Sequence, residues 1–169
     1  MSDTPQSGNN GAAGAAPNAA QPSLTVMAQY LKDLSFESPR APVSFKNAQQ
    51  PQIDVNVDVQ GRSIGTDQYE VELSVSAKAS HENEPVFIVE ASYAGAFEIK
   101  NMPREQLEGI MLVECPRLLF PFMRQIISDA TRNGNFPPLM LEPIDFMGIY
   151  LANQKQRQAA AASPAEQNA

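Results

Sequence analysis

The chain has 169 residues, enough for one domain with a hydrophobic core. Its 12 basic and 19 acidic residues give a formal net charge of −7, which argues against nucleic acid or an anionic membrane as a partner and favours basic partners. The single cysteine, Cys115, excludes an internal disulfide and fits a reducing compartment. Residues 1–23 lack the basic start and apolar run of a signal peptide, and no run is long enough to span a membrane. We therefore expect a soluble cytoplasmic protein without direct membrane insertion.

Composition divides the chain into three parts. Residues 1–23 are rich in Gly, Ala, Asn and Pro and have almost no large apolar side chains, so they are predicted to be a disordered tail. Residues 158–169 have a similar composition and are predicted to be a flexible tail, although their alanine run would also suit the end of a helix. The folded domain is then predicted at 24–157.

Apolar and polar residues alternate with period two through the first half of the domain, which predicts strands. The predicted strands are 30–37, 53–60, 69–77 and 86–99. In 30–37, alternation puts Tyr30, Lys32, Leu34 and Phe36 on one face and Leu31, Asp33, Ser35 and Glu37 on the other. We predict a loop at 61–67 and a turn at 81–84, and such short connections favour an antiparallel sheet.

The second half carries helix signals. Pro103, followed by Glu105, marks a helix start, and apolar residues then follow at helical spacing. Pro116 or Pro121 is predicted to break or kink this helix, because proline lacks an amide donor. Gly134 fits a helix end, and Asp145 is predicted to cap a last helix through about residue 157. The fold class is therefore α+β, with a four-stranded antiparallel sheet and long C-terminal helices packed on one face.

The segment 118–146 holds four of the eight Phe and four of the fourteen Pro residues. A segment that is both apolar and stiff suits the wall of an apolar groove, and it equally suits a crossing of the core. We predict a helix at 118–132 that starts or kinks at Pro121, followed by an irregular crossover at 133–145 that forms a groove wall.

Catalytic motifs are missing from the sequence. No phosphate-binding loop, dinucleotide fingerprint or nucleophile elbow is present. His81 lies in a polar cluster typical of a solvated turn, and Cys115 has the apolar neighbours of a buried thiol. We therefore predict no catalytic residue, no metal site and no cofactor, and a non-enzyme.

Two sets of residues are candidates for binding. The first is apolar and aromatic, and packing of the core or of an oligomer interface explains it equally well. Its members are Phe87, Phe122, Phe136, Phe146 and Tyr150. The second is an acidic strand face, for which a merely solvated surface is the alternative. Its members are Asp33, Glu37, Ile88 and Glu90.

Three stretches resemble the bacterial export chaperone family SecB, and the similarity covers about residues 24–157. They are YLKDLSFESPRAP at 30–42, ASYAGAF at 91–97 and LLFPFMRQIISDATRNGNFPPLMLEPIDF at 118–146. The resemblance implies a cytosolic homotetramer, a dimer of dimers, whose long helices lie between two layers of antiparallel sheet. It implies that the tetramer holds unfolded precursor proteins in apolar grooves without ATP and passes them to the translocation ATPase SecA.

The resemblance also gives roles to the two candidate sets. The SecA-docking positions of the family fall on Asp33, Glu37, Ile88 and Glu90. The groove aromatics correspond to Phe87, Phe122 and Tyr150, with Phe136 and Phe146 nearby.

The chain departs from the family at two places. Gln49 stands where the family has a groove Trp, and the tail beyond Arg157 is short and almost uncharged, where the family makes a further SecA contact. An enzyme or small-ligand binder on an α+β oligomer, and a structural oligomer without a client, are the alternative functions.

Overall fold

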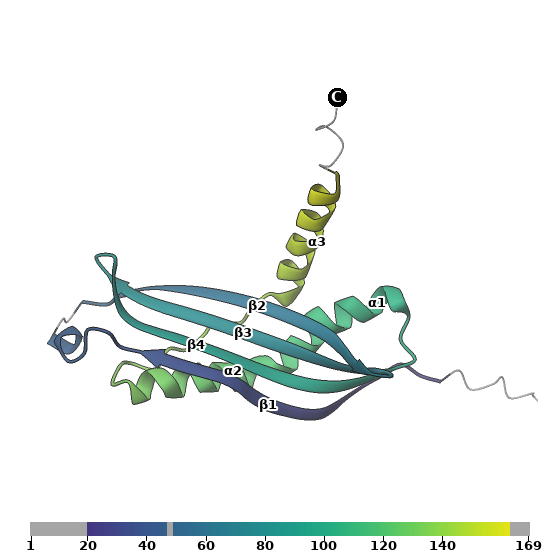
Figure 1. The fold of residues 1–169 in the computed structure, drawn as a ribbon, viewed down its shortest axis with the longest axis horizontal. Coiled ribbons are helices and arrows are strands. Elements are labelled where there is room, and N and C mark those ends of the chain that lie inside the picture. Colours follow the sequence, from purple (N-terminus) through teal and green to yellow (C-terminus); the bar gives the residue numbers. More distant parts are fainter. Residues whose placement is uncertain (1–19, 47–48, 163–169) are drawn as a thin grey trace, which may run out of the picture.

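The computed structural model describes residues 20–46 and 49–162, so most of the predicted N-terminal tail and residues 163–169 lie outside the described residues. Four long strands form one antiparallel sheet in the order β1-β4-β3-β2 (Figure 1). They are β1 (Ser23–Glu37), β2 (Gln52–Gly65), β3 (Gln68–His81) and β4 (Glu84–Lys100). The last three form a meander, while β1 pairs with β4, so β1 and β2 are the two edges of the sheet.

All four predicted strands are present, and each is longer than predicted. The predicted loop at 61–67 is wrong, because β2 continues to Gly65 and only Thr66 and Asp67 separate it from β3. The predicted turn between β3 and β4 is confirmed. Its central residues, Glu82 and Asn83, have φ values of 47° and 66°, as the two-residue turns that match the twist of a hairpin require.

The alternation predicted for 30–37 is wrong, because β1 contains a bulge. Leu31 pairs with Tyr93 and Asp33 pairs with the next residue of β4, Ser92, so Lys32 is an extra residue in the ladder. As a result Tyr30 and Lys32 lie on the outer face, where they bond glutamates of β3, while Leu31 and Leu34 lie on the helix-covered face. The spacing of three between these two leucines is the sequence signal that would have revealed the bulge.

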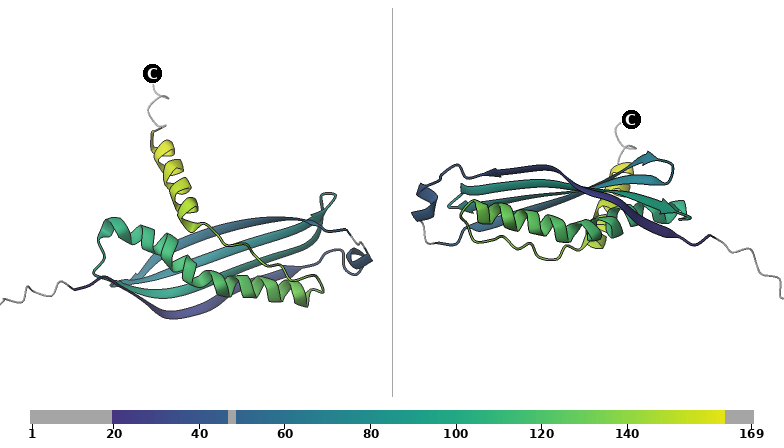
Figure 2. Two further views of the ribbon diagram at one scale, coloured as in Figure 1. Left: turned by 180° about the vertical axis from the view of Figure 1, so that it is seen from behind. Right: turned by 90° about the horizontal axis from the view of Figure 1, so that it is seen from below.

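One continuous helical rod covers the inner face of the sheet (Figure 2). It consists of α1 (Arg104–Gly109), a π-helical segment η2 (Ile110–Glu114) and α2 (Cys115–Asn133). Neither proline breaks it. Pro116 lies in the first turn of α2, where a missing amide costs little, and Pro121 lies inside the helix. The predicted helix start at Pro121 is therefore wrong, as is a break at either proline, and the predicted kink stays a prediction.

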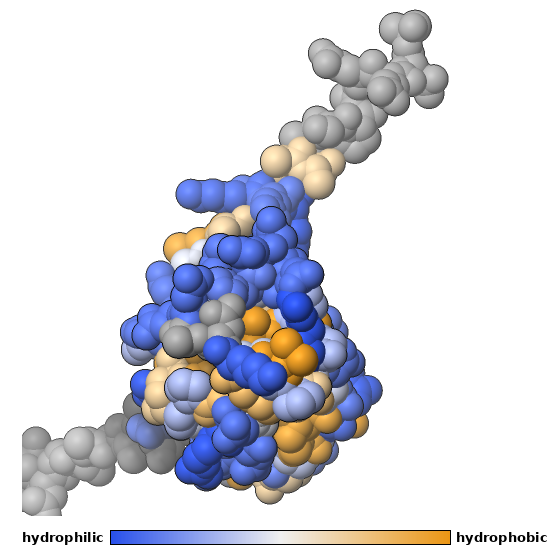
Figure 3. Space-filling view, turned by 90° about the vertical axis from the view of Figure 1, so that its left-hand side faces the viewer, coloured by the Kyte–Doolittle hydropathy of each residue, from blue (hydrophilic) through white to orange (hydrophobic). Residues whose placement is uncertain are grey.

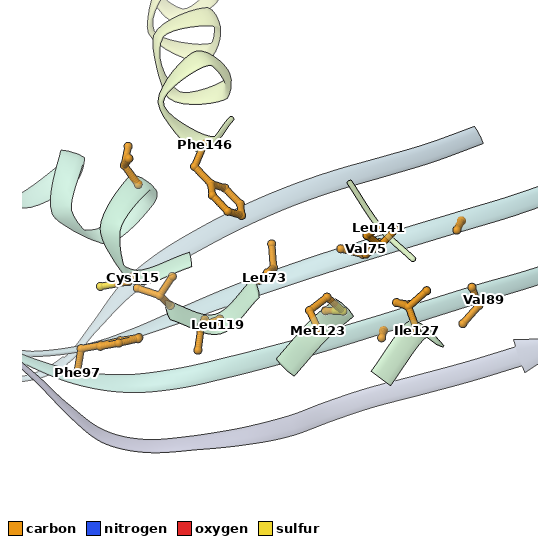
Figure 4. Close-up of a cluster of buried hydrophobic side chains, with 14 of the residues drawn as sticks. Leu73, Val75, Val89, Phe97, Cys115, Leu119, Met123, Ile127, Leu141 and Phe146 are labelled. Atoms are coloured by element: carbon orange, nitrogen blue, oxygen red, sulfur yellow. The ribbon is translucent and has the colours of Figure 1, made fainter. Parts of the chain in front are cut away.

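Packing explains why α2 tolerates an internal proline. Leu119, Met123 and Ile127 recur every four residues, are fully buried, and point toward the strands (Figure 4). Burying each such side chain contributes about 1.5–3 kcal/mol. Their sum exceeds the cost of about 3 kcal/mol for one proline in a helix.

The segment 134–145 has neither helix nor strand, which confirms the predicted irregular crossover. It runs back along the inner face and buries Leu141 against the core (Figure 4). The buried hydroxyl of Thr131 fixes this path, because it accepts a hydrogen bond from the amide of Leu139 at 2.9 Å and donates to the carbonyl of Ile127. The crossover is thus attached to α2 by a polar contact inside an apolar layer.

The last helix, α3 (Phe146–Ala162), departs from the prediction that both long helices pack on the sheet. It projects away from the body (Figure 1), with Phe146 buried at its base and Arg157 bonded to Glu108 at 2.6 Å. The predicted cap is confirmed, since a carboxylate oxygen of Asp145 accepts a hydrogen bond from the amide of Gly148. The helix includes the alanine run, so residues 158–162 continue it.

Candidate functional site

An aromatic cluster lies at one end of the inner face. The Phe87 ring on β4 is 4.9 Å from the Phe136 ring on the crossover, and 5.9 Å from the Phe36 ring on β1. Phe45, on the short 3-10 helix η1 (Val43–Lys46), completes the cluster at 5.3 Å from Phe136. Four segments that are distant in the sequence therefore meet through aromatic rings at preferred separations.

This cluster forms part of a groove of about 990 Å³. The groove is bounded by η1, the start of β2, the β3–β4 turn and the proline-rich crossover. Its apolar lining includes Val43, Phe45, Ile53, Phe87, Phe136, Pro137, Pro138 and Leu139. Phe87 is buried, whereas 42% of Phe45 is exposed, so the cluster has a fixed floor and an accessible rim. Figure 3, which looks onto this end of the molecule, shows apolar surface surrounded by hydrophilic residues.

The mouth of the groove is polar. His81 and Glu82 line it from the β3–β4 turn, and Arg40 forms an ion pair with Glu84 across it. Gln49 also lines the groove. The arrangement combines an apolar interior with a charged margin, which suits the binding of apolar segments that carry polar flanks.

The structure brings together only two of the five predicted groove residues, Phe87 and Phe136. Phe122 is 45% exposed on α2, where it stacks on Tyr93 at 5.7 Å. Phe146 is 2% exposed and packs against Phe120 in the core. Tyr150 is half-buried on α3, where its hydroxyl accepts a hydrogen bond from Gln154. The five residues therefore fall at four separate places.

Sequence reasoning missed Phe36 and Phe45 as members of the cluster. Simple alternation placed Phe36 with Tyr30 and Lys32, and nothing local marks Phe45. A tertiary constraint confirms the importance of the Phe36 ring, because a Cβ on Gly134 would lie 2.2 Å from its Cζ atom. The turn after α2 therefore needs a glycine to make room for this ring.

The predicted acidic residues meet on the outer face of the sheet, opposite the groove. In the β1–β4 register Glu37 pairs with Ile88, and Glu90 lies between Glu37 and Asp33, opposite Ser35. The rows of cross-strand neighbours that start at these residues continue across the sheet. They pass through Lys78, Ser76 and Ser74 on β3 and then through Asp54, Asn56 and Asp58 on β2. We call the five carboxylates of these rows the acidic end. They are Asp33, Glu37, Asp54, Asp58 and Glu90.

The acidic end is weakly compensated. Lys78 is the one cation in its rows, and none of the five carboxylates lies within ion-pair distance of a cation among residues 20–46 and 49–162. Asp33, Asp58 and Glu90 line a shallow hollow of about 300 Å³ together with serines of β3 and β4. This surface is suited to a basic segment that lies across the strands.

The neighbouring rows of the outer face carry balanced charges. Glu70, whose side chain is 6% exposed, accepts hydrogen bonds from Arg62 Nε at 2.5 Å and from the Tyr30 hydroxyl at 2.6 Å. Lys32 lies 3.5 Å from Glu70 and donates to Glu72 at 2.5 Å. The hydrogen bond from Arg62, followed by that from Tyr30, lowers the pKa of Glu70 to about 2. We call these five residues the paired end.

Cys115 lies in the core and is shielded from reaction. Burial raises the pKa of the Cys115 thiol to about 12, so it is inert as a nucleophile. Among the residues that the structure describes, no group of three or more His, Cys, Asp or Glu side chains is placed to hold a metal ion. No helix in the described part of the chain is long and apolar enough to cross a membrane.

Comparison with known proteins links this geometry to one family. The profile of the SecB family, described as "Preprotein translocase subunit SecB", matches residues 17–157. A "Protein-export protein SecB" of Maricaulis maris is 51% identical over 169 residues, covering 99% of this chain and 95% of the relative. One from Bartonella quintana is 52% identical over 134 residues, covering 79% and 85%, and one from Parvibaculum lavamentivorans is 47% identical, covering 98% of each chain.

A solved structure shares the fold. The Mycobacterium tuberculosis SecB-like chaperone Rv1957, in complex with a ChAD peptide from the HigA1 antitoxin, superposes with a TM-score of 0.60. The match covers 72% of this chain and 91% of the other, at 17% identity. At that identity the likeness establishes the α+β fold.

Proposed function

Because this chain belongs to the SecB family and is a protein-export chaperone, we propose that it holds unfolded precursor proteins in the cytoplasm without ATP and delivers them to SecA. The observation that carries this proposal is the pair of surfaces on opposite sides of one sheet. An aromatic groove of about 990 Å³ faces inward, and an acidic, weakly compensated surface faces outward.

The aromatic groove is the proposed client site, with Phe87 and Phe136 as its floor and Phe45 at its rim. Apolar burial has no direction, so such a groove accepts many sequences. Burying about 400 Å² of a client contributes on the order of 10 kcal/mol before ordering costs, which offset most of it. Single grooves therefore bind weakly, and several grooves on one assembly act together through effective concentration.

Phe122 and Tyr150 are proposed as further client contacts outside this groove. The ring of Phe122 presents an exposed apolar surface beside Tyr93, and Tyr150 is accessible on α3. Phe146 has too little exposed surface for a direct contact, and its proposed part is to hold the base of α3 in the core. A client that wraps around the protein would meet these positions in succession.

The acidic end of the outer face is the proposed SecA-docking surface. Glu37 pairs with Ile88, Glu90 lies two residues further along β4, and Asp33 lies four residues from Glu37 on β1. Charge complementarity to a basic partner gives association rate and specificity more than raw affinity. Placement on the opposite face leaves the groove free, so one chain binds client and SecA at the same time.

The proposed assembly is a homotetramer built as a dimer of dimers. β1 is a free edge whose unpaired backbone is accompanied by exposed Val26, Met27 and Leu31. Such an edge pairs readily with a second copy and would extend the sheet across the dimer. Two dimers would then meet through their helix layers, which puts several grooves on one particle.

One substitution tests the groove. Phe45→Asp puts a charge at the exposed rim, so it is expected to weaken the holding of a denatured precursor without unfolding the domain. The matched control is Ile64→Asp, because Ile64 is similarly exposed near the end of β2, outside the groove. The assay is the delay of precursor refolding in the absence of ATP, with native mass measured for each variant. Wild-type protein that leaves refolding unaffected would refute the chaperone proposal.

A charge reversal tests the docking surface. Glu37→Lys and Glu90→Lys are expected to weaken SecA binding while the delay of refolding stays unchanged. Glu105→Lys is the control, because Glu105 is exposed on α1 and lies off the sheet. Equal loss of SecA binding and client holding would indicate misfolding and would remove the docking assignment.

A further inference from the structure

The charge network of the paired end is unusual for a sheet surface. Glu70 on β3 is nearly buried on the outer face, yet it binds groups from both edge strands, Tyr30 on β1 and Arg62 on β2. Ala94 and Ala96 of β4 lie between Tyr30 and Glu70, and their small side chains let the tyrosine reach across. Replacing a buried ion pair by apolar residues is often neutral or stabilising, so stability alone is a weak reason for this arrangement.

The bulge in β1 supplies a better reason. Strand alternation normally puts adjacent residues on opposite faces, but the bulge puts Lys32 and Asp33 on the outer face together. A lysine thus stands beside a carboxylate of the acidic end. In the structure its Nζ is directed to Glu72, at 2.5 Å, and Glu70, at 3.5 Å. Arg62, two residues from Gln60 and four from Asp58 on the same face of β2, is held by Glu70 in the same way.

We propose that Glu70 is a positioning residue for the docking surface, which withholds Lys32 and Arg62 from the neighbouring carboxylates and so keeps the acidic end available to a basic partner. The proposal rests on the docking function proposed above. Removing the charge of Glu70 frees Arg62 and weakens the hold on Lys32, which then keeps only its contact with Glu72. Both cations can then turn toward the acidic end and partly neutralise the carboxylates that a basic segment of SecA would bind.

The central test is Glu70→Gln, which keeps the shape and a hydrogen-bond acceptor for Tyr30 while removing the charge. We expect SecA to bind this variant about three- to tenfold more weakly at low salt, as partial neutralisation of a surface patch predicts. The difference should close near 1 M salt, where screening acts within about 3 Å. The delay of refolding of a denatured precursor should stay unchanged.

The matched control is Glu98→Gln. Glu98 pairs with Lys100 on the same face of β4, so this change removes an equal charge and frees one cation. Eight residues separate Glu98 from Glu90, about 26 Å along a strand, which exceeds the screening length of about 8 Å at physiological salt. SecA affinity should therefore equal that of the wild type.

Rescue distinguishes electrostatic positioning from a structural role. Adding Lys32→Gln and Arg62→Gln to Glu70→Gln removes both freed cations, so SecA affinity should return to within about twofold of the wild type. If Glu70→Gln does not fold, Glu72→Gln replaces it, since Glu72 is more exposed and its loss frees Lys32. Glu72→Gln should lose less SecA affinity than Glu70→Gln is expected to lose, and adding Lys32→Gln should restore that affinity.

Three results are decisive against the inference. A folded Glu70→Gln variant that binds SecA as tightly as the wild type would overturn it. A loss of SecA affinity that Lys32→Gln and Arg62→Gln together do not restore would overturn it as well. The network would then act by holding the conformation of the strands and not through charge. Wild-type protein that does not bind SecA would refute the docking proposal itself, and the inference with it.

Discussion

Gly134→Ala is predicted to destabilise the domain by crowding the aromatic cluster. Gly134 follows α2 with φ near −75°, a conformation open to alanine, so the backbone itself is not the obstacle. The obstacle is Phe36, whose Cζ and Cε1 atoms would lie 2.2 Å and 2.5 Å from the new Cβ. Ordinary contact begins at 3.4 Å, so the ring would have to move by about 1 Å.

The ring has little room to move, because Phe87 and Phe136 flank it at 5.9 Å and 6.3 Å. Overpacking of this kind costs about 1–3 kcal/mol. Alanine also restricts the unfolded chain, which stabilises the folded state by about 0.4–1 kcal/mol. The free energy of unfolding should therefore fall by about 1–2 kcal/mol in total. For a domain of this size the loss lowers Tm by about 2–8 °C.

Gly109→Ala is the same chemical change, but it is expected to raise the stability of the domain. A Cβ at Gly109, in the last turn of α1, meets nothing within 4 Å. Alanine favours a helix over glycine by about 0.5–1 kcal/mol, so this variant should gain stability. Thermal and denaturant unfolding at equal protein concentration measure both variants. A Gly134→Ala variant as stable as the wild type would refute the packing of Phe36 described above.

Three further predictions concern buried polar groups. Thr131→Val leaves the amide of Leu139 without its acceptor and should cost about 1–3 kcal/mol in denaturant unfolding, whereas Thr131→Ser should restore most of it; equal stability of all three proteins would contradict this. Because the pKa of Glu70 is lowered to about 2 from an unfolded value of 4.5, its contribution is full above pH 4.5 and disappears as pH falls toward 2. The stability of Glu70→Gln should therefore vary less over that range, as unfolding measured at a series of pH values would show. Because the pKa of Cys115 is raised to about 12, the native thiol should resist alkylation at pH 8 and react once the chain is unfolded; rapid labelling of native protein would place Cys115 outside the core.

The sequence predicted the sheet well because apolar residues recur with a period of two through most of its strands. The runs that contain Val57 and Leu73 have polar residues at every second position, and both are strands of one antiparallel sheet. The crossover at 134–145 was also predictable, since Pro137, Pro138 and Pro143 lie within it and disfavour a regular element there. These features depend on local chemistry alone.

Features that depend on tertiary contacts were missed. A helix was expected to start or kink at Pro121, but Pro121 lies inside α2, where the burial of Leu119 and Met123 outweighs its local cost. Phe45 belongs to the groove because it contacts Phe136, which lies 91 residues later in the chain, and no local pattern predicts such a contact. The buried state of Glu70 likewise follows from Tyr30 and Arg62 on other strands.

The placement of both proposed surfaces on β1 and β4 makes their function depend on strand register. Phe87 and Val89 lie on the helix-covered face, and Ile88 and Glu90 face outward, so a slip of one residue would exchange the two sets. The bulge at Lys32, the second of two irregularities in the β1–β4 ladder, leaves Phe36 inward and Glu37 outward. The same bulge brings a lysine beside Asp33 and thereby creates the need for a counter-charge nearby. Glu70 and Glu72 meet that need, so the geometry that sets the register and the network that keeps the acidic end free arise from one extra residue.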